Sequence, residues 1–369
     1  MRILYLHQYF TTPEYQGGVR SYQFARRLVA AGHEVDLVTS SAFYPVAKPS
    51  AGLISRHQVD GITVHVIHVG YGNKMSFLRR VISFLLFMLV SSLYVARLKG
   101  NDIVFATSTP LTIGVPALVA RSVHKVPMVF EVRDLWPDVP IAMGYIKNQF
   151  AIKLLLRFEK YLYDKAARLV ALSVGMRDEI VRKGIPAEKI EVIPNACDIE
   201  DFNQVAAGRP EVDGFRQDAD TKICLYAGTF GYVNNLSYLV ELAKHIKDGD
   251  YNIRILLIGD GVEKSVIAEK IANLQLENHI RLIEPVSKQE LISYIKSVDA
   301  CFSSVKNIPA LFNNSANKFF DSLAAGKPII INHGGWQADV IRQYSLGLVL
   351  ECDAREGAEL LARFFADEE

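Results

Sequence analysis

Residues 313–328, NNSANKFFDSLAAGKP, carry the pattern from which the fold of this chain is predicted. Asn313, Asn314 and Ser315 are residue types that cap helix N-termini. Apolar residues then recur every three or four positions, and Gly326 followed by Pro328 ends the helix. The next four residues, IIIN, are typical of a buried strand. The stretch therefore predicts a loop, a short helix and a strand.

The start of this predicted helix has the features of an anion site. Backbone N–H groups near Ala316, Asn317 and Lys318 would face outward at the positive end of the helix, which suits a phosphate. Lys318 adds a formal charge, and Asp321, one turn further on, would accept hydrogen bonds from sugar hydroxyls. An ordinary capped core helix fits these residues equally well, so both interpretations stay open on this stretch alone.

A first α/β series occupies the N-terminal part of the chain. A short apolar strand is followed by GGVRSYQFARRLVAAGHEV, a helical pattern that opens with Gly17 and Gly18, and then by the strand EVDLVTS. Glycines at a helix start let the backbone approach a ligand closely. A plain strand-to-helix turn is the alternative. The pair is not a G-x-G-x-x-G fingerprint, so a dinucleotide site is weakly supported.

The loop DLWPDVP, residues 134–140, follows a predicted strand of this series. Open α/β sheets bind ligands at the carboxyl ends of their strands, so Arg133 and Asp134 are candidate site residues. The alternative is a structural Arg–Asp pair, with Trp136 as a packing anchor.

A second α/β series begins after a charged, Gly-containing stretch at residues 197–221. We therefore predict an N-terminal domain at 1–205 and a C-terminal domain at 206–369, each an α/β, doubly wound parallel sheet. Gly228 and Thr229 end the first strand of the second series. Gly-rich strand-to-helix loops in both domains favour a ligand in the cleft between them.

Composition excludes several classes of protein. Half of the 369 residues are hydrophobic and 22% are charged, which predicts a packed globular chain. The net charge of +1 argues against a nucleic-acid partner. The four cysteines form no C-x-x-C pair and the histidines have no metal-ligand spacing, so we predict reduced thiols in a cytoplasmic protein and no metal site. Of the histidines, His7 and His333 lie at predicted strand ends, where a site would be.

Residues 81–96, VISFLLFMLVSSLYVA, could be mistaken for a membrane span. The segment is shorter than the roughly 20 residues that a spanning helix needs, and Ser91 and Ser92 interrupt it. We predict a soluble protein with one very apolar helix.

Several motifs in order resemble glycosyltransferase family 4 over nearly the whole chain. They are GGVRSYQFARRLVAAGHEV, SVGMRDEIVRKGIPAEKIEVIPNACDIEDF, LLIGDGVEK, IRLIEPVSKQEL, KFFDSLAAGKPIIIN and HGGWQADVI. The resemblance implies two Rossmann-like domains in the GT-B arrangement and a retaining, metal-independent transfer from a nucleotide-diphosphate sugar, with no cofactor. The VRDLWP loop and the NKFFD form resemble the branch of bacterial O-antigen and capsule synthesis that includes N-acetyl-L-fucosamine transferases.

The resemblance also implies roles for individual residues. Gly17 and Gly18 would lie against the diphosphate, and Asn317 and Lys318 would bind it through backbone amides. Asp321 stands where the second Glu of the family's E-x7-E motif holds the ribose, and residues 283–285 match the base-binding strand. With the glycine turns, the candidate binding residues are Gly17, Gly18, Gly228, Thr229, Ile283, Pro285, Ser315, Asn317, Lys318 and Asp321. The candidate catalytic residues are Arg133, Asp134, Asn313 and Asp321.

Three departures from the family pattern bear on the donor. Asn313 replaces the first Glu of E-x7-E, and a neutral amide suits a deoxy or N-acetylated sugar. Thr229 and Asn234 replace a basic pair, so Lys318 and Arg133 would supply the positive charge. Arg133 also stands where many members have a His near the acceptor. We expect a UDP-sugar donor and a polyprenyl-diphosphate-linked acceptor at the cytoplasmic face of the inner membrane.

The apolar helix then has two interpretations. With Lys74, Arg79 and Arg80 before it, residues 74–97 could dock on an anionic membrane surface. The alternative is a fully buried helix of the first domain.

Two other functions stay open. A GT-B 2-epimerase or hydrolase would act on the nucleotide sugar alone, and would need titratable groups such as His7, Arg133 and Asp134 at the anomeric carbon. A non-catalytic member that binds a sugar nucleotide would explain the missing Glu and basic pair.

Overall fold

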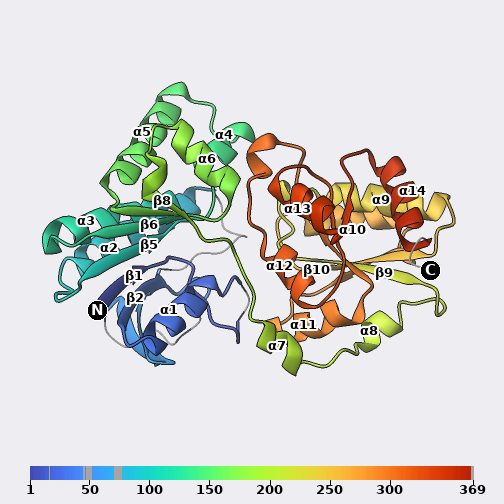
Figure 1. The fold of residues 1–369 in the computed structure, drawn as a ribbon, viewed down its shortest axis with the longest axis horizontal. Coiled ribbons are helices and arrows are strands. Elements are labelled where there is room, and N and C mark those ends of the chain that lie inside the picture. The colour runs from blue at the N-terminus through green and yellow to red at the C-terminus, as the bar shows by residue number, and fades with distance from the viewer. Residues whose placement is uncertain (16, 45, 47–51, 70–76, 367–369) are drawn as a thin grey trace. The chain divides into compact units, whose positions relative to one another are not determined.

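The computed structural model describes residues 1–366 apart from 16, 45, 47–51 and 70–76, and these residues form two compact units (Figure 1). The first unit is Met1–Pro194 and the second is Asn195–Glu369. Each has its own sheet covered by helices on both faces, so the α/β, doubly wound fold predicted from the sequence is confirmed.

The sheet of the first unit has the strand order β3-β4-β2-β1-β5-β6-β7-β8. Its pairs are parallel except β3 with β4, an antiparallel edge hairpin that the prediction of a purely parallel sheet missed. The strands are β1 (Arg2–Leu6), β2 (Glu34–Ser40), β3 (Ile54–Val59), β4 (Ile62–Ile67), β5 (Ile103–Thr107), β6 (Met128–Val132), β7 (Arg168–Ala171) and β8 (Ile190–Val192).

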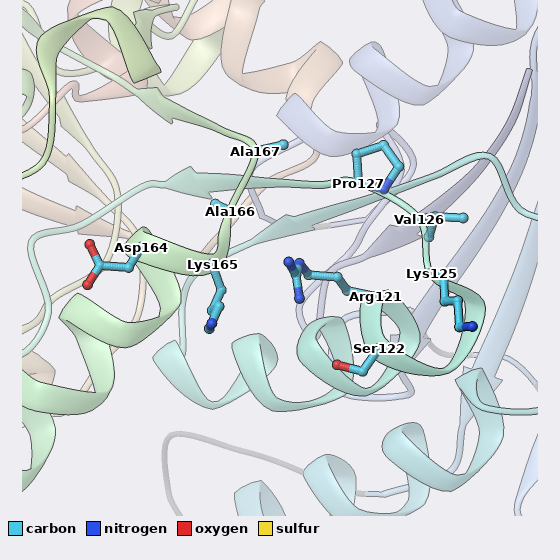
Figure 2. Close-up of a pocket in the computed structure, with 9 residues that line it drawn as sticks. All are labelled: Arg121, Ser122, Lys125, Val126, Pro127, Asp164, Lys165, Ala166 and Ala167. Atoms are coloured by element: carbon cyan, nitrogen blue, oxygen red, sulfur yellow. The ribbon is translucent and has the colours of Figure 1, made fainter.

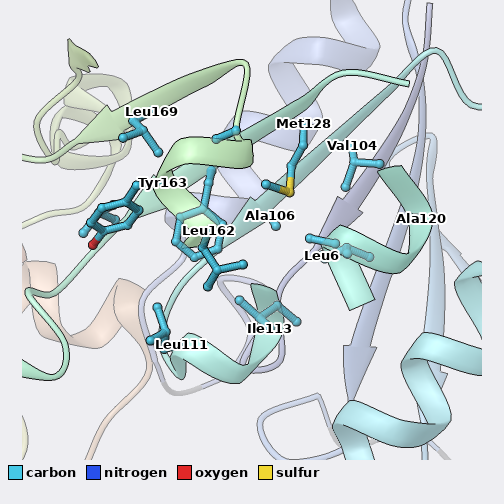
Figure 3. Packing of buried hydrophobic residues seen from close by; sticks show 14 of the residues in the cluster. Leu6, Val104, Ala106, Leu111, Ile113, Ala120, Met128, Leu162, Tyr163 and Leu169 are labelled. Carbon is cyan, nitrogen blue, oxygen red and sulfur yellow. The ribbon is translucent and has the colours of Figure 1, made fainter. Parts of the chain in front are cut away.

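Alternating side chains divide the core of this unit between the two faces of the sheet. Tyr5 packs beneath α1 with Tyr22 and Ala25, whereas Leu4 and Leu6 point to the opposite face. Figure 3 shows the cluster on the face of Leu4 and Leu6, in which residues of β1, β5 and β6 meet residues of α3 and α5. The helices are α1 (Arg20–Ala30), α2 (Phe77–Val95), α3 (Gly114–His124), α4 (Asp138–Ala142), α5 (Gln149–Lys165) and α6 (Val174–Arg182).

The sheet of the second unit is parallel throughout, in the order β11-β10-β9-β12-β13-β14. Its strands are β9 (Lys222–Ala227), β10 (Ile253–Ile258), β11 (Ile280–Ile283), β12 (Ala300–Ser303), β13 (Ile329–Ile331) and β14 (Gly347–Val349). Its helices are α7 (Ile199–Gln204), α8 (Pro210–Asp213), α9 (Leu236–Asp248), α10 (Lys264–Asn273), α11 (Lys288–Ser297), α12 (Asn317–Ala324), α13 (Trp336–Tyr344) and α14 (Ala354–Ala366). Residues of α9, α10 and α14 cover one face, and residues of α7, α8, α11, α12 and α13 cover the other.

The second unit starts earlier in the chain than the domain boundary predicted between residues 205 and 206. Phe202 of α7 is buried together with Val212 and Phe215 in the core of the second unit. The charged stretch that suggested a linker therefore contains core residues, and the compact units meet between Pro194 and Asn195.

Helix α2 has two apolar faces. One packs into the core through Phe87 and Val95. The other remains exposed, with side-chain exposures between 41% and 57% at Ile82, Leu85, Leu86, Leu89 and Leu93. The alternative of a fully buried helix is therefore wrong. Among the described residues, no helix combines the length and apolar character that crossing a membrane requires.

Candidate functional site

The strand order of the second unit defines where a ligand would bind. Counted along the chain, its strands lie in the order 3-2-1-4-5-6, so the direction of winding reverses between β9 and β12. Open α/β sheets bind ligands outside the carboxyl ends of the strands at this reversal. Gly228 follows β9 there, Ser303 ends β12, and α12 is the helix that leads from β12 to β13.

A tightly interlocked pair of turns forms the edge beside β9. The N–H of Gly228 donates to the carbonyl of Ile258 at 3.0 Å, and the N–H of Phe230 donates to the carbonyl of Asp260 at 2.9 Å. A Cβ on Gly259 would lie only 1.9 Å from the carbonyl oxygen of Gly228. Because neither turn has room to shift, the exposed Thr229 is held on a rigid support.

Helix α12 begins as predicted, but its N-terminus has no side-chain cap. The capping position is Ala316, and the N–H groups of Ala316, Asn317 and Lys318 donate to no acceptor among the described residues. Ser315 has a different role, because its Oγ accepts from the N–H of Asn195 at 3.1 Å and its carbonyl accepts from the Asn195 side chain. The helix end thus keeps its positive dipole exposed to a ligand.

The side chain of Lys318 reaches across to the end of β9. Its Nζ lies 3.3 Å from the hydroxyl of Tyr226 and 4.4 Å from the centroid of that ring, beside Gly228. No carboxylate lies within 4.0 Å of this ammonium in the described part of the chain. Burial lowers the pKa of Lys318 to about 8, with Asp321 opposing the shift. A phosphate would neutralise this poorly solvated charge.

Asp321 already has a partner. Its Oδ1 accepts from the Nζ of Lys288 at 2.6 Å, and both side chains are largely buried. Lys288 is the first residue of α11, which Ser287 and Glu290 hold in a reciprocal capping box. The sequence predicted that Asp321 holds the ribose, but it did not predict that Lys288 pairs with Asp321. Ile283 and Pro285 lie just before the same helix and are half-buried.

A second group of polar side chains lies around residues 312–314. The His333 ring stacks on Phe312, with centroids 5.7 Å apart and an angle of 18°. Asn314 accepts through its carbonyl from Trp336 Nε1 at 2.8 Å and from Gln337 Nε2 at 3.1 Å. Asn313, the candidate for the donor sugar, therefore stands between two anchored residues. Sequence reasoning noted His333 but missed Gln337, whose only signal was its place after the glycine pair.

The corresponding edge of the first unit lies at the carboxyl ends of β1, β5 and β6. Arg133 directs Nη1 at His7 Nε2 over 3.4 Å, and its N–H donates to Ser108 Oγ at 3.0 Å. Burial and the cation of Arg133 hold the pKa of His7 well below its usual value. Asp134 accepts instead from Thr109 Oγ1 at 2.7 Å. No Arg133–Asp134 ion pair appears among the described residues, so the purely structural pair considered from the sequence is not formed.

Gly17 and Gly18 precede α1 as predicted. Gly17 has a φ of 127°, and a Cβ there would lie 3.0 Å from a Thr11 methyl group. The helix itself begins with Arg20, which sequence analysis did not single out. Its guanidinium donates to Glu131 Oε1 at 2.9 and 3.0 Å, and both side chains are almost completely buried. This ion pair anchors the start of α1 to the centre of the sheet.

The hollow drawn in Figure 2 is separate from these edges. It has a volume of about 580 Å³ and is lined by Arg121, Lys125, Asp164 and Lys165, with the residues that precede β6 and β7. It therefore lies at the amino ends of the strands, opposite the edge where α/β sheets bind ligands. Its residues are mainly exposed and carry no part of the candidate site.

Two family models match the chain in succession. The model described as "Glycosyl transferase 4-like domain" matches residues 17–196, and the one described as "Glycosyl transferases group 1" matches residues 211–369. Together they account for nearly all of both compact units.

Curated relatives are distant. A putative colanic acid biosynthesis glycosyl transferase, WcaI of Escherichia coli, is 24% identical over 72% of this chain and 68% of its own length. An N-acetylgalactosaminyltransferase of Campylobacter jejuni that acts on N-acetylgalactosamine-N,N'-diacetylbacillosaminyl-diphospho-undecaprenol is 24% identical over 57% of this chain. The match covers 53% of that relative's length, so the chain spans about half of it.

Solved structures match over almost the whole chain. Sucrose-phosphate synthase from Thermosynechococcus elongatus has a TM-score of 0.72 at 18% identity, with 99% of this chain and 90% of that one covered. Anabaena HepE, solved in complex with UDP and glucose, has a TM-score of 0.67 at 16% identity, with 100% and 90% covered. At such identities these likenesses establish the GT-B fold alone. The two family models, which match successive parts of the sequence, make the chain a member of glycosyltransferase family 4.

Proposed function

We propose that this protein is a retaining, metal-independent hexosyltransferase that moves a sugar from a UDP-sugar to a lipid-linked saccharide during bacterial surface polysaccharide synthesis. One observation carries the proposal: within the described residues, Lys318 has no anionic partner at an uncapped helix N-terminus, at the carboxyl edge where the winding of the sheet reverses. A diphosphate supplies both the charge and the acceptors that this edge lacks.

The proposed donor site uses the rest of that edge. The free N–H groups of Asn317 and Lys318 bind the diphosphate, Gly228 and Thr229 border it, and Asp321 shares the ribose with Lys288. Residues 283–285 meet the base, and Asn313 meets the donor sugar. In the first unit, Gly17, Gly18, Arg133 and Asp134 stay candidate site residues, and Arg133 and Asp134 are assigned to the acceptor.

In the proposed reaction the protein acts by positioning and charge stabilisation. The bond between the anomeric carbon and the diphosphate oxygen breaks as the acceptor hydroxyl forms a new bond on the same face of the sugar. The acceptor proton passes to the departing diphosphate. Lys318 and the N–H groups of α12 stabilise the negative charge that develops there, so the protein itself supplies no nucleophile.

Thermal unfolding with UDP, GDP, ADP and NAD tests the donor assignment. Because a bound ligand raises the unfolding midpoint by mass action, UDP alone should raise it. A shift with GDP alone would overturn the uridine assignment, and a shift only with NAD would overturn the transferase. Acceptor-dependent release of UDP then separates a transferase from an epimerase or a hydrolase, which would turn over the donor alone.

The proposed lipid-linked acceptor requires access to a membrane surface, and α2 offers a face for it. Leu85, Leu89 and Leu93 are exposed, Arg79 and Arg97 flank the row, and no acidic residue occurs from 77 to 99. An anionic bilayer matches this combination of apolar and basic groups. Lys74, which the sequence prediction included, lies outside the described residues.

Flotation with phosphatidylglycerol vesicles tests this contact. Leu85→Glu with Leu89→Glu should abolish binding, and Arg79→Glu with Arg97→Glu should weaken it most at low salt. Val174→Glu with Val181→Glu is the matched control, because both residues are exposed on α6 of the same unit. If the leucine variant binds the vesicles as well as the control variant does, α2 is not the membrane contact.

A further inference from the structure

Two buried hydrogen-bond acceptors beside residues 312–314 have no donor in the part of the chain that the structure describes. They are Nε2 of His333 and Oε1 of Gln337, in side chains whose residues are 1% and 0% exposed. Buried polar atoms are nearly always hydrogen-bonded in native proteins, so each unmatched atom calls for an explanation. Neither atom has a partner among the described residues; His333 lies in the loop after β13, and Gln337 lies in the first turn of α13.

The tautomer of His333 follows from its contact with the backbone. Nδ1 lies 2.7 Å from the carbonyl oxygen of Gly334, and a carbonyl can only accept, so Nδ1 carries the hydrogen. In the neutral ring Nε2 then presents a lone pair. Burial lowers the pKa of His333, and the nearby Lys318 cation lowers it further. The group at this position is therefore an acceptor.

The orientation of the Gln337 amide follows from the same argument. Its nitrogen lies 3.1 Å from the carbonyl oxygen of Asn314, which can only accept. Turning the amide over would bring two oxygens together, so Nε2 stays towards Asn314 and Oε1 points away from it. A second acceptor is thereby held in place by the backbone.

Both side chains border residue 313, one on each side. His333 stacks on Phe312, and Gln337 is bonded to Asn314. Besides burial, the Lys318 cation lowers the pKa of His333, so His333 lies on the side of the site where the diphosphate is proposed, and Gln337 lies one turn into the helix that follows His333. The missing partners must be O–H or N–H donors, since phosphate and carboxylate oxygens at neutral pH would face lone pairs.

We propose that His333 Nε2 and Gln337 Oε1 accept hydrogen bonds from hydroxyl or acetamido N–H groups of the donor sugar, and so select the sugar rather than the nucleotide. The inference rests on the proposed function, because it takes the diphosphate at Lys318 as the point to which the sugar is attached. It predicts that a sugar hydroxyl binds more tightly than a group of similar size that cannot donate a hydrogen bond. A buried acceptor left without a donor makes the free energy of binding less favourable.

Calorimetric titration of UDP and of four UDP-sugars tests the inference. The probes are UDP-glucose, UDP-galactose, UDP-N-acetylglucosamine and UDP-N-acetylgalactosamine. At least one should bind the wild-type protein more tightly than UDP. His333→Phe, which keeps a ring on Phe312, and Gln337→Met should each weaken that sugar about tenfold and leave UDP unchanged. His279→Phe is the matched control, because His279 is a part-buried histidine before β11, at the amino edge of the same sheet.

The outcomes separate this inference from the function on which it rests. Failure of UDP to bind the wild-type protein would remove both. If UDP binds tightly but no UDP-sugar binds more tightly than UDP, the inference alone is overturned. The same holds if both variants still bind the preferred UDP-sugar more tightly than UDP by the same factor as the wild type. Water would then be the partner of the two acceptors. If both variants fail to fold, analogues of the preferred UDP-sugar with single hydroxyls replaced by fluorine are titrated against the wild type, and equal binding by every analogue overturns it.

Discussion

The cationic side chains at the carboxyl edges of the two sheets have different partners. In the first unit the Arg20 guanidinium meets Glu131, and Arg133 meets the lone pair of His7. In the second unit Lys318 meets the hydroxyl and ring of Tyr226, next to three N–H groups that find no acceptor in the described part of the chain. The first edge pairs its buried Arg20 with a carboxylate, whereas the second edge gives Lys318 no carboxylate among the described residues.

This difference indicates which edge is incomplete without a ligand. A buried ion pair stabilises the start of α1 whether or not anything is bound. A poorly solvated ammonium without a carboxylate costs stability in the empty protein, and the cost disappears when an anion arrives. Four changes would break or sharpen this comparison.

The largest effect is expected from Glu131→Ala in the first unit. The change leaves the buried Arg20 without its carboxylate, and removing one partner of such a pair costs about 3–5 kcal/mol of unfolding free energy. Denaturant unfolding should show the loss as a lower midpoint.

Glu284→Ala is the control for that change. Glu284 pairs with Lys264, but its side chain is 79% exposed, so the effect should stay within about 0.5 kcal/mol. Equal midpoints for the two variants would contradict the view that the first edge is held together by its own charges.

Lys318→Met should stabilise the empty protein, whereas Glu131→Ala destabilises it, and Lys318→Met should strongly weaken UDP binding. Loss of the uncompensated ammonium should raise the unfolding midpoint of the empty protein near pH 7, while UDP affinity falls by about 1–3 kcal/mol. Lys327→Met, just beyond the other end of α12, provides the control and should leave UDP affinity unchanged. A variant that loses stability but keeps UDP affinity would show that the lysine is structural.

The pH dependence of UDP binding should report the same lysine. The pKa of Lys318 is lowered to about 8, so the free protein is charged below that value and loses the charge as pH rises through it. UDP affinity should therefore fall by up to about tenfold per pH unit above pH 8. Lys318→Arg should flatten the profile, and it also controls for titration of the nucleotide. A profile that both proteins share would exclude Lys318 as its source.

The smallest effect on UDP is expected from Arg133→Ala. Its partners are His7 and Ser108 in the first unit, so UDP affinity should change by less than about 0.5 kcal/mol. Removing the cation should raise the pKa of His7, which an NMR titration of the imidazole can follow. A loss of UDP affinity as large as that of Lys318→Met would mean that both edges hold the nucleotide.

Local pattern predicted many elements of the fold, but it missed the β3–β4 hairpin and the helices α7 and α8. The helix at 317–324 and the strand after it follow from the spacing of apolar residues and from Gly326. The glycine turn after β9 was also visible, because its residues are consecutive. The assignment of nucleotide-sugar roles to these residues stays a prediction.

Contacts between distant residues could not be predicted in this way. Lys288 with Asp321, Tyr226 with Lys318 and Arg20 with Glu131 are each separated by many residues, and nothing in the local pattern around one residue identifies its partner. The exposure of α2 was left undecided between two interpretations for a different reason. When nearly every position of a helix is apolar, periodicity cannot tell the buried face from the exposed one.

The bond between Asn195 and Ser315 also has a consequence for biosynthesis. The two residues are 120 positions apart, so at about 5–20 residues per second the ribosome adds Ser315 on the order of ten seconds after Asn195. The loop that leads into α12 gains this anchor only when most of the chain has emerged. We expect arrested nascent chains to bind UDP only once they include β13, which ribosome-bound chains of increasing length would reveal.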